Sequence, residues 1–246
     1  MGRIGVNTKG TPMKIVEFNN PMDITVEFQD EHKYRKKTFM PTFAKGSVKN
    51  PYDITVWGHG YRGDGDYLEQ VDGIKSVRYN VWEQMLKRCY NFKNPQYQPT
   101  YTGEITVCNE WLNFQNFAKW YDENYYEVPN EKMQLDKDIL HKGNKIYNPN
   151  DCIFVPQTIN LIFVRRKNYR NGTPCGVGKQ GNHYYATCGH DKIIDNLGSF
   201  NTPEEAFQAY KIRKEETVKQ TADGYKQYIP QRLYDALYNW KTDITD

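Results

Sequence analysis

The sequence lacks several patterns that would place it in a familiar class. No C-x-x-C pair occurs, which excludes the usual structural zinc site. No run approaches the ~18 apolar residues of a membrane-spanning helix, and no apolar segment of signal-peptide length accompanies Arg3 and Lys9. The 5 cysteines are odd in number and widely spaced. We therefore predict reduced, mostly buried thiols in a cytoplasmic protein without a membrane partner.

A large excess of positive charge is also missing, because the formal net charge is only +3. Local clusters of Lys and Arg, rather than net charge, determine whether a surface can hold a phosphate backbone. Such clusters occur at 32–37, 87–88 and 165–170, interleaved with aromatic residues and Asn. Each alone is typical of a solvated face. Together they favour a nucleic-acid partner, with contacts expected at Arg35, Lys36, Lys37, Arg165, Arg166 and Lys167.

The composition favours a core built from aromatic side chains, since the hydrophobic fraction is 38% and Tyr occurs 20 times. A length of 246 residues suits two or three compact modules. We predict an α+β protein in three parts. These are a small β module over 1–66, a domain with a ββα finger and flanking helices over 67–165, and a three-stranded sheet plus helix over 166–246.

The first part alternates apolar and polar residues. This alternation predicts strands over 14–18 and 23–28, with turn formers at 19–21 between them. A Gly-rich segment follows at 58–66. It lacks the G-K-[ST] and G-x-G-x-x-G frames, so we expect a linker rather than a phosphate-binding loop.

The middle part shows helical spacing. Within 82–89, Trp, Met, Leu and Cys recur at i, i+3, i+4 and i+7, which puts an apolar stripe on one helix face. A second helix is expected over 109–121, with Asn109 as its cap and its aromatic side chains in the core. Between the helices, 104–107 has the character of a strand. Beyond them, a strand at 135–140, a polar loop, a second strand at 149–156 and a helix at 157–163 predict a ββα finger.

The last third also changes from strands to helices. Strands are expected over 184–188, 192–194 and 197–200. Thr202 as N-cap, Pro203 at the first helical position and Glu205 closing a capping box predict a helix start. This helix runs towards Lys219, and a short helix is expected over 230–240.

Four motifs in the middle part carry a resemblance. They are W-E-x-M-L-K-R-C-Y at 82–90, V-C-N-E-W at 107–111, L-D-K-D-I-L at 135–140 and N-P-N-D-C at 148–152. With them the segment resembles the HNH-like proteins of bacteriophages, which act in a bacterial host cell. In HNH nucleases an acidic residue and a late Asn or His hold a divalent metal on the scissile phosphate, while a His activates water. The resemblance implies Mg²⁺ or Mn²⁺ held by Asp136 and Asp151, and places Lys137 on the His.

The lysine departs from the family pattern. A protonated Lys cannot accept the proton of water unless its pKa falls by several units. Cleavage would then need Asp138, His141 or a metal-bound hydroxide as the base. In addition, Asp136 and Asp138 alternate along the predicted strand, which would direct them to opposite faces.

A structural interpretation of the same residues is open as well. Asp136 and Asp138 would pair with nearby lysines, and Asp151 would cap the next helix. Such a finger needs no cofactor. It would still offer backbone amides, Lys142 and Lys145 to a phosphate backbone.

A second resemblance lies in the C-terminal part. Its residues are G-V at 176–177, Y-A-T at 185–187, L-G-S-F at 197–200, T-P-E-E-A at 202–206 and A-Y at 209–210. This part resembles the DNA-binding domain of plant ethylene-response factors, which also occurs fused to phage HNH nucleases. The resemblance implies a three-stranded sheet in the major groove of double-stranded DNA with a helix behind it. The sheet arginines of that family are sparse here. The contact residues implied are Lys179, Asn182, Tyr184, His190 and Lys192.

The N-terminal part has a weaker resemblance. N-T-K-G at 7–10, M-K-I-V at 13–16 and N-P-Y at 50–52 are similar to short β modules repeated in phage proteins of the same kind. Backbone contacts through 35–37 are the only chemistry expected of it.

Three functions follow from these observations. The first is an HNH-type endonuclease of a phage or mobile element, whose other modules supply duplex affinity. The second is a catalytically inactive descendant that binds DNA as a regulator, which Lys137 favours. The third is a phage inhibitor of a host protein acting in defence or transcription, because a fold does not fix a function and aromatic surfaces also suit protein interfaces.

Overall fold

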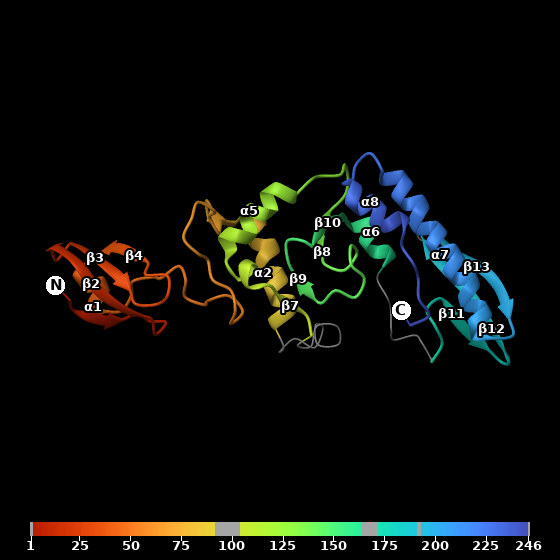
Figure 1. Cartoon of the computed structure of the whole chain (residues 1–246), viewed down its shortest axis with the longest axis horizontal. Coiled ribbons are helices and arrows are strands. Elements are labelled where there is room, and N and C mark those ends of the chain that lie inside the picture. Colours follow the sequence, from red (N-terminus) through yellow and green to blue (C-terminus); the bar gives the residue numbers. More distant parts are fainter. Residues whose placement is uncertain (1, 92–103, 164–171, 191–192, 246) are drawn as a thin grey trace. The chain divides into compact units, whose positions relative to one another are not determined.

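The computed structural model describes residues 2–91, 104–163, 172–190 and 193–245 (Figure 1). Helices and several small, mostly antiparallel sheets make up the described chain, which confirms the α+β class. The chain divides into two compact units. The first comprises 1–123 with 146–148, and the second comprises 124–145 with 149–246. From the sequence we predicted three parts with boundaries after residues 66 and 165, and this division stays a prediction.

The first unit begins with a four-stranded antiparallel sheet of order β1-β2-β3-β4, which carries helix α1. Strands were predicted at β2 and β3, and both are present. The apolar side chains of one sheet face pack with Phe43 of α1 and Val48 into a core of their own. The elements are β1 (Ile4–Val6), β2 (Pro12–Asn20), β3 (Asp23–Phe28), β4 (Arg35–Thr38) and α1 (Met40–Ala44).

The rest of the first unit is a helical core. The apolar stripe predicted on α2 is buried, and Ser76 accepts a hydrogen bond from the amide of Tyr79 at the start of that helix. Strand β7 pairs in parallel with β9. The elements are β5 (Gln70–Val71), β6 (Ile74–Lys75), α2 (Val77–Tyr90), β7 (Thr106–Val107), α4 (Asn109–Leu112), α5 (Phe114–Asn124) and β9 (Ile146–Tyr147).

The single helix predicted over 109–121 is wrong, because the chain forms α4 and α5 with an extended Asn113 between them. The amide of Tyr61 donates to the carbonyl of Leu112, and the amide of Phe114 donates to the carbonyl of Tyr61. These two bonds take up backbone groups that a continuous helix would use. Asn109 is not the cap either, since Cys108 occupies that position without a side-chain bond.

The Gly-rich segment is not a free linker, which corrects the prediction for 58–66. A Cβ on Gly60 would lie 2.5 Å from Leu86 and 2.8 Å from Trp82, so only Gly lets this backbone pack on α2. Gly63 has a φ of 72° and approaches the side chain of Asn113 in the same way. The glycines therefore bring this segment against the helical core.

The second unit contains the predicted finger. Strands β8 (Met133–Asp136) and β10 (Ile153–Pro156) pair antiparallel, with Asp136 opposite Ile153, and α6 (Gln157–Ile162) follows directly. Its apolar side chains share a core with helices α7 (Pro203–Tyr225) and α8 (Gln231–Tyr238).

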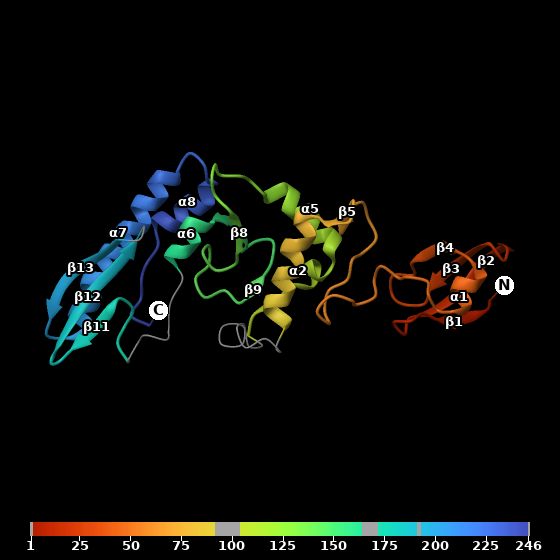
Figure 2. The same ribbon diagram turned by 180° about the vertical axis from the view of Figure 1, so that it is seen from behind.

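The C-terminal strands form the three-stranded antiparallel sheet β11-β12-β13, one face of which α7 covers in both views (Figures 1 and 2). The strands are β11 (Val177–Gln180), β12 (His183–His190) and β13 (Ile193–Phe200). The capping box predicted at Thr202 and Glu205 is present, and α7 extends beyond Lys219. Its N-terminal half packs on the sheet through Phe207, whereas its C-terminal half packs on the finger through Val218. One helix therefore joins the two cores.

The structure places none of the five cysteines in a disulfide, and Cys89, Cys152 and Cys188 are buried. Among the residues that the structure describes, no helix combines the length and the apolar character needed to cross a bilayer.

Candidate nucleic-acid interface and finger

Asp136 terminates β8 and caps the turn that follows it. Its Oδ1 accepts hydrogen bonds from the amides of Asp138 (3.0 Å) and Ile139 (2.8 Å). The prediction that Asp136 and Asp138 alternate along one strand is therefore wrong, because the chain leaves the strand at Asp136. Burial raises the pKa of Asp136 to about 6, and the nearby carboxylate of Asp138 adds to this rise.

Lys137, which the HNH resemblance would align with a catalytic His, forms a cross-link in the loop after β8. Only 7% of the residue is exposed. Its Nζ donates to Oδ2 of Asp138 (3.0 Å) and to the carbonyl of Asn144 (2.9 Å). The predicted pairing of Asp138 with a nearby lysine is confirmed. An ammonium group that donates two hydrogen bonds offers no lone pair to water.

His141 and Asp151 form a pair on the same loop system. Nδ1 of His141 lies 2.7 Å from Oδ1 of Asp151, and 68% of the His141 side chain is exposed. Asp151 does not cap α6, which corrects the structural interpretation, since the N-cap of α6 is Pro156. In a neutral imidazole, a carboxylate at Nδ1 favours the tautomer that carries its proton on Nδ1 and leaves Nε2 as the acceptor. The pair thus has the form of an oriented base.

The two expected metal ligands are engaged in different local contacts. Asp136 holds backbone amides, whereas Asp151 holds His141. In the described ranges, no three His, Cys, Asp or Glu side chains gather as a group that could hold a metal ion.

Lys142 and Lys145 are the two finger lysines expected to contact phosphates. The ammonium group of Lys142 is bound by residues of its own unit. It donates to Oδ2 of Asp243 (2.6 Å) and to the carbonyl of Lys241 (3.0 Å), and it lies over the ring of Trp240. Lys145 is exposed.

The face of the C-terminal sheet away from α7 is an exposed polar surface, which we call the outer sheet face. Residues directly opposite each other on antiparallel strands share a face. The register pairs Gln180 with His183, Tyr185 with Ser199, and Thr187 with Asn196. Ala186 and Cys188 are buried against α7, so these three pairs project outwards. The outer sheet face is Gln180, His183, Tyr185, Thr187, Asn196 and Ser199.

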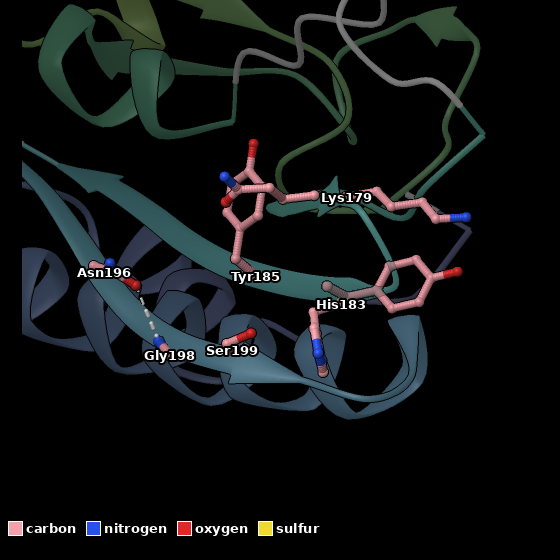
Figure 3. A pocket seen from close by; sticks show the side chains of 8 residues that line it. Lys179, His183, Tyr185, Asn196, Gly198 and Ser199 are labelled. Carbon is pink, nitrogen blue, oxygen red and sulfur yellow. Dashed lines mark hydrogen bonds between the residues drawn. The ribbon is translucent and has the colours of Figure 1, made fainter.

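A shallow hollow of about 700 Å³ lies on this face, lined by five of its six residues together with Lys179, Tyr184 and Gly198 (Figure 3). Asn196 accepts a hydrogen bond from the amide of Gly198. Within the described ranges, the side chains of Gln180, His183 and Ser199 form no hydrogen bond. Their donors and acceptors are therefore available to a ligand.

Tyr184, one of the expected DNA contacts, shares the sheet face that packs on α7, although it also lines the hollow. It packs partly buried on the sheet core, and Lys179, opposite it in register, lies over its ring at 5.5 Å. Tyr185 is the exposed neighbour, at 41%. The signal was present in the sequence, because period-two alternation with buried Ala186 places Tyr184 inwards. Asn182 lies in the exposed turn between β11 and β12.

The close approach of Tyr185 to β11 depends on a glycine. A Cβ on Gly178 would lie 2.1 Å from Cζ of Tyr185. The ring therefore lies directly over the β11 backbone. Sequence reasoning missed both residues, together with Gln180, His183, Asn196 and Ser199.

The basic run on β4 divides between two faces. Arg35 is opposite Glu27 and binds its Oε2 at 2.8 Å, and Lys37 shares that face. Lys36 is opposite Val26 and shares the face of the N-terminal core. One duplex surface cannot use all three side chains, because neighbours in a strand point in opposite directions.

Several predicted contacts fall outside the described residues. These are Arg165, Arg166 and Lys167, Lys192, and the side chain of His190.

Comparison with known proteins assigns no relative: no family model, no curated protein and no solved structure matches the chain.

Proposed function

We propose that this protein binds double-stranded DNA without cleaving it, and that the outer sheet face contacts the bases. The observation that carries the proposal is the exposed outer sheet face, whose side chains are polar and include no carboxylate, ammonium or guanidinium group. The major groove, about 12 Å wide, admits such a surface, and its base edges present donors and acceptors. Gln180 and Asn196 are amides, which match the adenine edge.

The finger supports binding rather than cleavage. Lys137 stands where a base is needed and is bound by Asp138 and Asn144. Because α7 packs on both the finger and the sheet, the finger would be held at a fixed position along a bound duplex. The finger would fix the register of the protein on the duplex through backbone contacts and would not read the bases.

A selection from a random duplex library, followed by fluorescence anisotropy with the selected site, tests the proposal. We expect Gln180→Ala and Tyr185→Ala each to weaken binding by about 10-fold, since one good base contact is worth ~1–3 kcal/mol. The control is Gln208→Ala, an exposed position on α7. Equal affinity of all variants, or no duplex binding even at low salt, would contradict base contact through this face.

The slope of log affinity against log salt separates base contacts from phosphate contacts. Substitutions of uncharged outer-face residues should leave the slope unchanged. Lys179→Ala should reduce it by about 0.9 if Lys179 neutralises a phosphate, because each neutralised phosphate contributes that amount.

A second candidate function is metal-dependent DNA cleavage, which the His141–Asp151 pair favours. In this case His141 would replace Lys137 as the base, with Mg²⁺ or Mn²⁺ at Asp136. A plasmid-nicking assay with either metal decides between the candidates. Nicking by the wild type that is lost in Asp136→Ala and in His141→Asn would establish the nuclease. We expect no nicking by the wild type.

A further inference from the structure

A second hollow, of about 850 Å³, lies in the first unit and belongs to no site described above. All of its lining residues are in that unit. One wall comes from the turn at 7–9, the β4 edge and the segment after α1. The other wall comes from 62–69 with Phe114 and Gln115. The first of these we call the lysine wall.

The lysine wall presents three ammonium groups, those of Lys9, Lys36 and Lys49. All three residues are exposed, and within the described ranges none of their ammonium groups forms an ion pair or hydrogen bond. Several lysines elsewhere, such as Lys75, pair with carboxylates. The lining also carries five Ser and Thr hydroxyl groups, those of Thr8, Thr38, Thr42, Ser47 and Thr55.

Two of the three carboxylates around the hollow are held by local contacts. Both carboxylate oxygens of Asp53 accept hydrogen bonds, one from Asn7 at 2.7 Å and the other from the hydroxyl of Thr11. Glu69 forms an ion pair of 2.7 Å with Arg62. Asp64 is the remaining acidic residue of the lining. Three lysines without an ion pair therefore share the lining with two carboxylates without one, Asp53 and Asp64, and both oxygens of Asp53 are taken up by neutral donors. The remaining excess of positive charge favours an anion in the hollow.

The lysine wall is held in place before any ligand arrives. The bond from Asn7 to Asp53 joins positions 46 apart and ties the turn that carries Lys9 to the segment after Lys49. Oδ1 of Asn7 also accepts from the amides of Lys9 and Thr11, both at 2.9 Å. A preformed turn lowers the entropic cost of binding.

The opposite wall has a different character. Tyr67 and Leu68 line it, and 62% of Leu68 is exposed. The side chain of Gln115 holds this segment by accepting from the amide of Tyr67 and donating to its carbonyl, both at 3.0 Å. Tyr67, Leu68 and Phe114 give this part of the lining apolar surface beside its charged residues, which suits a ligand with a flat ring and a phosphate.

We propose that this hollow binds a phosphate-bearing ligand of nucleotide size, with the phosphate at Lys9, Lys36 and Lys49. Lysine ammonium groups and hydroxyls are ordinary phosphate partners. The phosphate belongs either to a free nucleotide or to a nucleotide unit of a DNA strand, and one experiment distinguishes these sources.

The test is titration calorimetry on the full chain with pyrophosphate, a nucleoside triphosphate and a short DNA duplex. The key variant replaces Lys9, Lys36 and Lys49 by Gln. The matched control replaces Lys14, Lys33 and Lys45 by Gln, three exposed lysines of the same module outside the hollow. Circular dichroism and thermal unfolding verify that both variants fold.

We expect the key variant to bind at least one of these ligands about 10-fold more weakly or worse, since three charge-assisted contacts are lost, and the control to bind normally. Loss of triphosphate and pyrophosphate binding identifies a free nucleotide. Loss restricted to the duplex identifies a DNA phosphate. Absence of binding by all three ligands, or equal weakening in both variants, would overturn the proposal. Tyr185→Ala should weaken duplex binding alone, because pyrophosphate and a triphosphate do not depend on the outer sheet face. Failure of the hollow proposal is therefore separable from failure of the proposed function.

Discussion

Lys137 and Asn144 hold each other through two hydrogen bonds across seven positions of the chain. The Lys137 ammonium donates to the Asn144 carbonyl at 2.9 Å, and the Asn144 side-chain amide donates to the Lys137 carbonyl at 2.7 Å. Lys137 therefore closes the loop after β8, at the position where the HNH resemblance would put a catalytic base. Its two hydrogen bonds with Asn144 hold the loop of the finger in one conformation.

Removing this cross-link should destabilise the second unit. Lys137→Ala leaves the Asn144 carbonyl without its donor, so we expect the free energy of unfolding to fall by about 1–3 kcal/mol in urea titrations. Lys132→Ala, at an exposed neighbouring position, should change it by less than about 0.5 kcal/mol. Similar small effects of both substitutions would show that the cross-link contributes no stability.

The carboxyl of Asp136 should make stability depend on pH. Burial, with a contribution from Asp138, raises its pKa to about 6 in the folded chain, against about 3.9 when unfolded. Folding therefore takes up a proton between these values. The stability from this group is present below about pH 4 and is lost as pH rises through about 6.

Asp136→Asn should remove this dependence while keeping an oxygen for the two backbone amides. We expect the mutant to gain stability relative to wild type between about pH 4 and about pH 7, by at most ~3 kcal/mol. Urea unfolding of both proteins across this range measures the difference. Parallel pH profiles would contradict the raised pKa.

Gly178→Ala should displace the ring of Tyr185, since the added Cβ would lie 2.1 Å from Cζ. Tyr185 is exposed and able to rotate away, so we expect a change in unfolding free energy below about 1 kcal/mol. DNA affinity should fall as in Tyr185→Ala. Gly189→Ala on β12 is the control, because its Cβ would meet only the Ile193 carbonyl at 3.8 Å. Normal DNA affinity of Gly178→Ala would exclude the ring position from recognition.

Two glycine substitutions should have opposite effects on stability. Gly60→Ala places a methyl against Leu86 and Trp82 and should cost about 1–3 kcal/mol by overpacking. Gly224→Ala in the last turn of α7 meets nothing within 4 Å and should stabilise by up to about 1 kcal/mol. Thermal unfolding of both variants measures the contrast. A neutral Gly60→Ala would indicate that the segment at 58–66 moves freely.

Local signals determined much of the fold. The spacing within 82–89 gave α2, and Thr202 with Glu205 gave the start of α7, because both depend on contacts within one helix turn or two. The alternation of buried and exposed residues along β12 also indicates that the side chain of Tyr185 points outwards, although the prediction named Tyr184 as the contact residue. These features need no partner from a distant part of the chain.

Long-range contacts decided the rest. Tyr61 divides α4 from α5 through backbone bonds that no local pattern encodes, and Asp53 holds Asn7 from 46 positions away. The role of Lys137 also followed from tertiary structure, because its environment includes the carbonyl of Asn144 after the loop has closed. The sequence by itself determined which residues are available and which elements form. Only the tertiary structure decided which charges are bound and which remain exposed, since this depends on groups brought together by folding.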